Sequence, residues 1–141
     1  MVAERIFDRA LGDLHARALV AIARADDQIG LEEGLRLQQV IELRTGGPIA
    51  LDDLLLAEPL EPHRLAESMR EPSQPFRTAG LHPGELAVMI ITDGIVVVLA
   101  KGYVSEAEAR EIVRFASALG CPRDQVSALC SRAAPWLATL I

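Results

Sequence analysis

Aromatic side chains are scarce in this chain. Phe, Trp and Tyr make up only 4% of its 141 residues, although half of the residues are hydrophobic. The core therefore has to consist mainly of Leu, Ile, Val and Ala, a composition that suits packed helices. A chain of this length can bury a real core within one unit. The composition predicts a single compact all-α domain over residues 1–141.

Cysteine and basic residues are also in short supply. Cys121 and Cys130 have no matching Cys or His pair at zinc-ligand spacing, which excludes a zinc finger and favours reduced thiols in a cytoplasmic protein. There are 14 Lys and Arg residues against 20 Asp and Glu residues, for a net charge of -6. This balance argues against nucleic acid and anionic lipid surfaces as partners.

The chain lacks both a long apolar run and a catalytic set. Its N-terminus has no apolar segment typical of an export signal. The most apolar stretch, residues 86–100, is interrupted by Asp93 and Gly94 and is shorter than the roughly 20 residues that a membrane span needs. It predicts a buried central helix instead. Serines, cysteines and histidines form no nucleophile with an orienting base, so we expect no enzyme activity.

Hydrophobic periodicity and proline positions set the expected helices. Apolar residues recur at three-and-four spacing, and six of the eight prolines fall between residues 46 and 84, where they limit helices to short ones. On the second helix, Leu35, Leu37, Val40 and Ile41 are expected to face inward. The helices are expected over residues 7–25, 31–44, 50–58, 62–70, 84–101, 105–120 and 122–133.

Two segments 75 positions apart share a pattern. "ADDQIGLEE", from Ala25 to Glu33, aligns with "AKGYVSEAE", from Ala100 to Glu108. Each follows a long apolar helix and precedes an amphipathic one, which indicates a duplicated helical hairpin. The repeat halves are expected at about 5–45 and 84–120, joined by a connector of short helices and loops over 46–83.

These turns resemble the tellurite-resistance TerB-like family, which includes the N-terminal domain of a membrane-anchored DnaJ-type co-chaperone. The family hallmark is a twice-used Ala-Asp-Gly-x-[Ile/Val]-x-x-x-Glu turn. The first copy here has Asp27 where Gly is usual, and the second has Lys101 where Asp is usual. The matching positions are Ala25, Asp26, Asp27, Gln28, Ile29 and Glu33, then Ala100, Lys101, Gly102, Tyr103, Val104 and Glu108.

The resemblance implies an all-helical fold of about seven helices, with two hairpins related by a pseudo-twofold axis. It also implies a bacterial stress-response setting, membrane-associated protein partners and suspected divalent-cation binding by the acidic turns. It brings no enzyme activity.

The acidic residues Asp26, Asp27 and Glu33 are the candidate interaction or metal residues. Helix capping accounts for Asp27 and Glu33. Asp26 is expected in the last turn of a helix, where it opposes the helix dipole and needs a positive charge. A calcium or magnesium ion could supply that charge, and so could an arginine such as Arg24.

In the second copy, Lys101 is expected to pair directly with Glu108, so no metal is needed there. Asp93, in the middle of the apolar helix, is a further candidate polar site. A buried carboxylate needs hydrogen-bond donors, so Asp93 is either satisfied by Arg or Thr groups or serves as a switch or ligand contact.

The sequence thus favours a non-enzymatic module that binds a protein partner, with a homodimer left open. Exposure of Leu54, Leu55, Leu56 or the tail around Trp136 would support this function. Two alternatives remain open. One is a divalent-cation sensor or buffer that uses the acidic turn. The other is a small-molecule or lipid carrier with a cavity beside the first helix and Asp93.

Overall fold

The computed structural model describes residues 9–26, 28–56, 60–70, 83–122, 124–125 and 127–128, and every regular element in them is helical. The all-α prediction is therefore confirmed. The expected helix over 122–133 lies largely outside the described residues, and the tail around Trp136 lies wholly outside them. The elements are α1 (Arg9–Ala23), α2 (Leu31–Thr45), α3 (Leu51–Leu56), α4 (Pro62–Arg70), α5 (Pro83–Val98), the short 3-10 helix η2 (Leu99–Lys101) and α6 (Glu106–Ala118).

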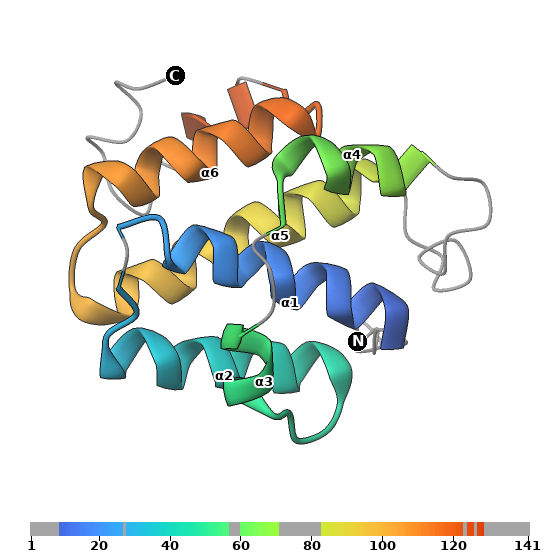
Figure 1. Ribbon diagram of the computed structural model, residues 1–141. Helices are drawn as coiled ribbons and strands as arrows, with labels where there is room; N and C mark the ends of the chain where they lie inside the picture. Colours follow the sequence, from blue (N-terminus) through green and yellow to red (C-terminus); the bar gives the residue numbers. More distant parts are fainter. Residues whose placement is uncertain are drawn as a thin grey trace, which may run out of the picture.

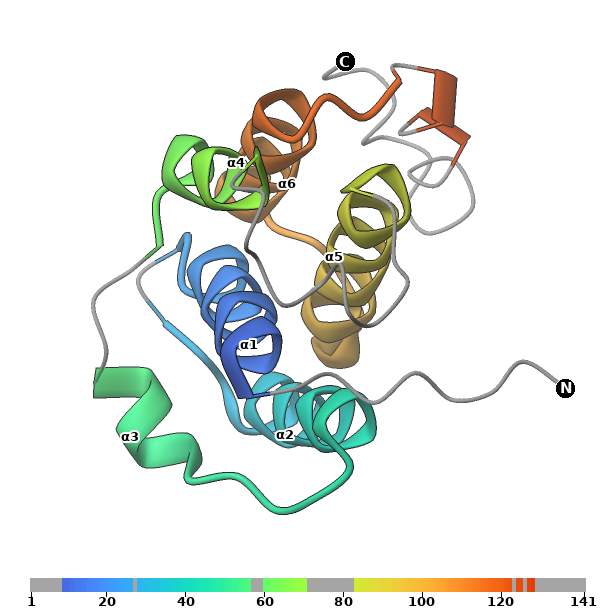
Figure 2. The same ribbon diagram turned by 90° about the vertical axis from the view of Figure 1, so that its right-hand side faces the viewer.

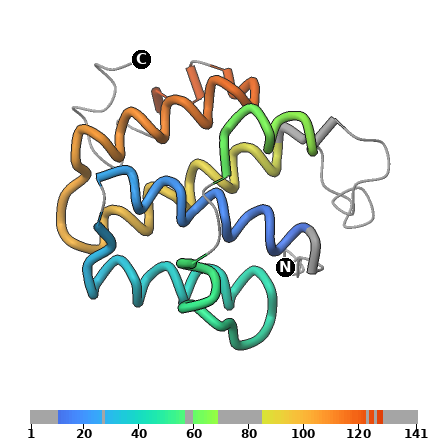
Figure 3. The backbone as a smooth tube through the Cα atoms, viewed as in Figure 1, coloured from blue at the N-terminus to red at the C-terminus, as the bar shows by residue number. Residues whose placement is uncertain are grey.

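Two long helices form the centre of the molecule. Figure 1 shows α1 and α5 side by side and running in the same direction, with α2 returning on one side and α6 on the other. Figure 2 gives the same arrangement from the side and places α4 beside α6. The hairpins α1–α2 and α5–α6 thus pack together through their first helices. The turns inside both hairpins meet at the same end of the molecule (Figure 3).

The apolar core has two parts that share α1 and α5. One part packs α1, α4, α5 and α6 around Phe115, and the other packs α1, α2 and the end of α5 around Leu37, with α3 against it. Gly94 allows α1 and α5 to approach closely, because a Cβ atom there would lie 2.8 Å from Cδ1 of Ile22. The predicted buried central helix is confirmed, since most side chains of α5 are buried. Among the described residues, no helix combines the length and apolar character that crossing a membrane would require.

One inward-facing prediction is wrong. Leu37, Val40 and Ile41 of α2 are buried as expected, but Leu35 is exposed. The buried set on α2 includes Glu33, and helical geometry then places position 35 on the opposite side of the helix. Leucines occur on both sides of α2, so its periodicity alone did not show which side packs against the core.

Local signals fix the start of α6. The Ser105 side chain accepts a hydrogen bond from the backbone N–H of Glu108, and the Glu108 carboxylate accepts one from the backbone N–H of Ser105. This is the capping box that the sequence predicts. It places Glu108 at the third position of α6, with its side chain directed back toward the preceding turn.

Replacing Ser105 by alanine is expected to lower the free energy of unfolding by about 1 kcal/mol, because alanine cannot accept the Glu108 N–H. Chemical denaturation of the variant measures this loss. Ser117→Ala, at an exposed position of the same helix, is the matched control and is expected to cause no loss. Equal unfolding midpoints for Ser105→Ala and the wild type would contradict the cap.

Candidate functional site

Lys101 lies between two buried glutamates at the end where the two turns meet. Its Nζ is 2.5 Å from Oε1 of Glu108 and 3.1 Å from Oε2 of Glu33. The side chains of Lys101, Glu33 and Glu108 are 13%, 3% and 0% exposed. We call these three residues the Glu–Lys–Glu cluster. The expected Lys101–Glu108 pair is present, and Glu33 from the other hairpin joins it.

Each member of the cluster is placed by its own local structure. Lys101 is the last residue of η2, and Gly102 then turns the chain with a φ of 96°, a left-handed conformation that glycine adopts freely. Glu108 is held by the capping box. Glu33 occupies the third position of α2, after Gly30, which has no side chain to cap the helix. The expected capping role of Glu33 is thus replaced by a contact with the second hairpin.

The charges of the cluster do not balance when both glutamates are ionised. Burial, followed by the hydrogen bond to Glu108, raises the pKa of Glu33 to about 7, against the influence of Lys101. For Glu108, burial is outweighed by hydrogen bonds from Glu33, Lys101 and Ser105, so its pKa is lowered. Two close carboxyl groups behave in this way when they share one proton. Near neutral pH the cluster therefore gains or loses a proton, mainly at Glu33.

Lys101 remains the charged member. Burial disfavours its ammonium form, but the hydrogen bonds to Glu108 and Glu33 have the larger combined effect and raise the pKa of Lys101. Its Nζ also lies 3.4 Å from the backbone carbonyl oxygen of Val98 and 5.0 Å from the centre of the Tyr103 ring. A permanent positive charge is thus fixed between the two hairpins.

The acidic turn of the first hairpin is built differently from the expectation. Helix α1 ends at Ala23, so Asp26 lies beyond the last helical turn and does not oppose the helix dipole there. Its Oδ1 accepts a weak hydrogen bond of 3.4 Å from the backbone N–H of Gln28. Arg24 instead donates to the backbone carbonyl of Leu55, at 2.8 Å. The helix dipole therefore gives no reason for a cation at Asp26. Asp27 lies outside the described residues.

A second polar cluster holds Asp93 in the middle of the molecule. Arg44, from the last turn of α2, donates to both carboxylate oxygens at 2.9 and 3.0 Å. Nε2 of the fully buried His15 lies 2.8 Å from Oδ2. Burial favours the protonated form of Asp93, but His15 and Arg44 outweigh it and lower the pKa of Asp93. The expectation of a satisfying arginine is confirmed.

Sequence reasoning missed His15. It is 78 positions from Asp93 and belongs to no motif. A signal was nevertheless available, because His15 shares a helix face with Leu11, Ala18 and Ile22 at the four- and three-residue spacing of the apolar stripe. A histidine on such a stripe is buried and needs a polar partner.

The outer side of α2 carries a row of exposed leucines. Leu31, Leu35 and Leu43 are 76%, 54% and 61% exposed, and Gln39 completes their four-residue spacing. We call these three leucines the leucine face. Leu56, at the end of α3, is 84% exposed, whereas Leu54 and Leu55 pack partly against the core. Of the leucines flagged in the sequence, Leu56 is thus the exposed one.

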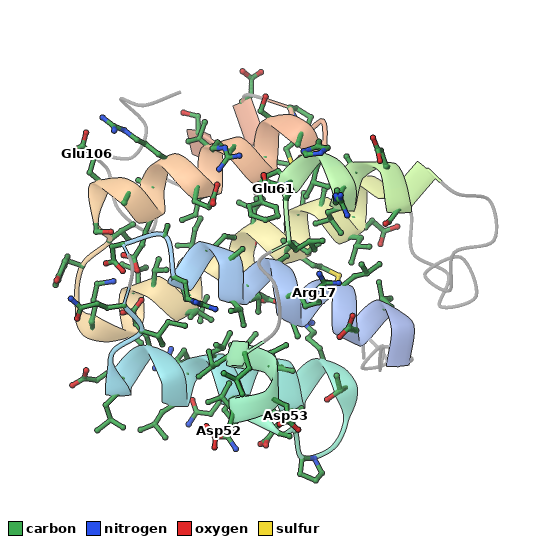
Figure 4. All side chains as sticks on the ribbon, viewed as in Figure 1. Arg17, Asp52, Asp53, Glu61 and Glu106 are labelled. Atoms are coloured by element: carbon green, nitrogen blue, oxygen red, sulfur yellow. The ribbon has the colours of Figure 1, made fainter. Side chains whose placement is uncertain are left out.

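Exposed acidic side chains occur on α2 and on the next helix, α3. Asp52 and Asp53 on α3 and Glu32 on α2 are exposed, with Arg36 as the exposed base of α2. Figure 4 shows Asp52 and Asp53 at the same side of the molecule as α2, whereas Glu106, at the start of α6, lies far from them.

The described surface also has an open groove of about 450 Å³ between α4 and α6. At the groove, Arg114 pairs with Glu111 at 2.7 Å and with Glu61 at 3.4 Å, so its charge is already matched. The groove is lined by Pro62, His63, Val113, Arg114, Ser117 and Ala118.

A divalent cation does not fit the Glu–Lys–Glu cluster as it stands, because the Lys101 ammonium already lies between the two carboxylates and would repel it. Within the described part of the chain, which omits Asp27, no three His, Cys, Asp or Glu side chains are placed to hold a metal ion. Comparison of the chain with protein-family models, curated proteins and solved structures finds no match.

Proposed function

We propose that this chain is a non-enzymatic, cytoplasmic protein-binding module that docks its partner on the leucine face of α2. The observation that carries the proposal is the row of Leu31, Leu35 and Leu43, exposed on a helix whose opposite side is packed into the core. Single exposed leucines are ordinary, but a row on one helix is typical of a surface that another helix covers.

The exposed charges of this part of the molecule favour a basic partner. On α2 the exposed charges are Glu32 and Arg36, α3 adds the exposed Asp52 and Asp53, and the chain carries a net charge of -6. A second copy of the chain would bring like charges together, whereas an amphipathic helix with Lys or Arg beside its apolar stripe would not. We therefore propose a basic amphipathic helix as the occupant in preference to a homodimer.

The TerB-like resemblance supports the same function. It rests on the two turns, which the fold brings to one end of the molecule, and it would place the module in a bacterial stress response with a membrane-associated partner. The carrier alternative has less support, because His15 and Arg44 already bind the carboxylate of Asp93, where a ligand was expected.

Site-specific photocrosslinking tests the proposal. A photoreactive amino acid is placed at position 35 of the full chain in the source cells, and at position 106 as a control, because Glu106 is exposed but far from α2. We expect a discrete adduct with one partner protein from position 35 and none from position 106. Mass spectrometry of the adduct should locate the crosslink on a helix of positive net charge.

The variant Leu35→Ser completes the test. Because Leu35 is more than half exposed, the substitution is expected to change the free energy of unfolding by less than about 0.5 kcal/mol. When the photoreactive amino acid is placed at position 31 instead, Leu35→Ser should nevertheless abolish the adduct with the partner. Adducts of equal strength from positions 35 and 106 would overturn the docking proposal. An adduct at position 35 containing only a second copy of the chain would replace the basic partner with a homodimer.

A further inference from the structure

Lys101 connects the two hairpins, a role that is separate from partner binding on α2. Its ammonium touches one glutamate from each hairpin, and these glutamates occupy equivalent places in the two repeated turns, each at the third position of the following helix. The cluster therefore joins the two halves of the repeat at their turns, as Asp93 joins them through Arg44 and His15 in the middle of the molecule.

Without Lys101, the two glutamates would face each other with no positive charge between them. Both are more than nine-tenths buried. The Lys101 ammonium contacts Oε1 of Glu108 and Oε2 of Glu33, and Oε2 of Glu108 has no hydrogen-bond partner among the described residues. Two such carboxylates repel each other unless a positive charge or a proton lies between them. Carboxylate oxygens are also the ligands that hard cations prefer.

The repeat shows which residue has changed. Lys101 aligns with Asp26, so the second turn has a base where the first has an acid. Asp26 stays within its own turn, where it accepts the Gln28 N–H, whereas Lys101 reaches across to the other hairpin. The reversal of charge at this position puts an ammonium group where the two carboxylates would otherwise need a proton or a cation from solution.

We propose that Lys101 is a tethered cation that fills a cation site formed by Glu33 and Glu108, so that the chain joins its two hairpins without an ion from solution. Removal of the amine opens this site to free cations. The inference is independent of the leucine face and of any partner.

The test uses Lys101→Met, which keeps most of the side-chain length and removes the amine with its charge. Thermal unfolding is followed in calcium chloride, magnesium chloride and methylammonium chloride, with tetramethylammonium chloride as the ionic-strength control, since that ion is large and has no N–H donor. We expect a lower Tm than in the wild type, and recovery of Tm with one or more of the three small cations. Above the dissociation constant, a tenfold rise in cation should raise the folding equilibrium constant about tenfold.

Two further variants separate this role from loss of packing. Lys101→Met/Glu33→Gln lacks one carboxylate, so it should fold and lose the cation response. If Lys101→Met does not fold, Lys101→Gln carries the same test, because its amide is polar enough for this site but uncharged, so the negative charge of the two glutamates stays unmatched. A folded Lys101→Met or Lys101→Gln whose Tm responds to none of the small cations would overturn the proposal. The proposal would also be overturned if the small cations raised the Tm of the wild type as much as that of the variant.

Discussion

Replacing Asp93 by asparagine is expected to lower the free energy of unfolding by about 3 kcal/mol. Removal of one member of a buried ion pair typically costs about 3–5 kcal/mol, because the other charge is left unmatched. The lower end applies here, since the Arg44 side chain is partly exposed and can reach water. His15 cannot, because it is fully buried. Chemical denaturation at neutral pH measures the loss.

Asp13→Asn is the matched control for this prediction. Asp13 lies on α1, is largely exposed, and is 3.8 Å from Arg17 in a surface pair. The same chemical change there is expected to cost less than about 1 kcal/mol, as for other exposed ion pairs. If Asp93→Asn proved as stable as Asp13→Asn, the cluster of Asp93, Arg44 and His15 would not be the buried ion pair that the distances indicate.

The second large effect is a dependence of stability on pH that comes from Glu33. The pKa of Glu33 is about 7 in the folded chain, against an ordinary value of 4.5. The folded state therefore holds the proton more tightly than the unfolded state does. The contribution of Glu33 to the free energy of unfolding is fully present below pH 4.5 and is lost as the pH rises through 7. This loss amounts to at most about 3 kcal/mol.

The pKa shifts of the other two carboxylates, Glu108 and Asp93, have the opposite sign. Their effect on stability falls in a lower pH range. The lowered pKa values of Glu108 and Asp93 contribute stability above pH 4.5 and 3.8, respectively, and this contribution is lost as the pH falls below those values. Lys101, whose pKa is raised, loses its contribution only in alkaline solution. Among these four groups, Glu33 therefore dominates the change between pH 5 and 8.

Glu33→Gln isolates this effect. The amide imitates the protonated carboxyl group and leaves the Lys101–Glu108 pair intact. We expect the variant to match the wild type near pH 5 and to be more stable at pH 8, where the wild type has lost the proton. The measured quantity is the difference in free energy of unfolding between the two proteins at each pH, which cancels the titration of groups that they share.

Glu32→Gln is the control, because Glu32 is the exposed neighbour of Glu33 on the same helix. Its difference curve against the wild type should stay flat between pH 5 and 8. A flat curve for Glu33→Gln as well would mean that Glu33 is already ionised at pH 5 and shares no proton with Glu108.

The sequence by itself determined the helices and most of the core. Helix α4 has the bounds that its sequence predicts, Pro62 to Arg70, and α6 begins at the expected capping box. These features depend on hydrogen bonds between residues three or four positions apart and on the fixed φ of proline, so a short stretch of sequence is enough to specify them. Burial of α5 followed from composition, because such an apolar helix is stable in water only when it is covered.

Only the tertiary structure decided which charged residues meet and which leucines remain outside. The sequence marked Glu33, Lys101, Glu108 and Asp93, but the partners of Asp93 lie 49 and 78 positions away. The contact of Lys101 with Glu33 likewise joins two hairpins. Such pairs depend on how whole helices pack, and helical periodicity says nothing about that. The exposure of Leu35 has the same origin, since the side of α2 that meets α1 and α5 was selected by the packing of all three helices.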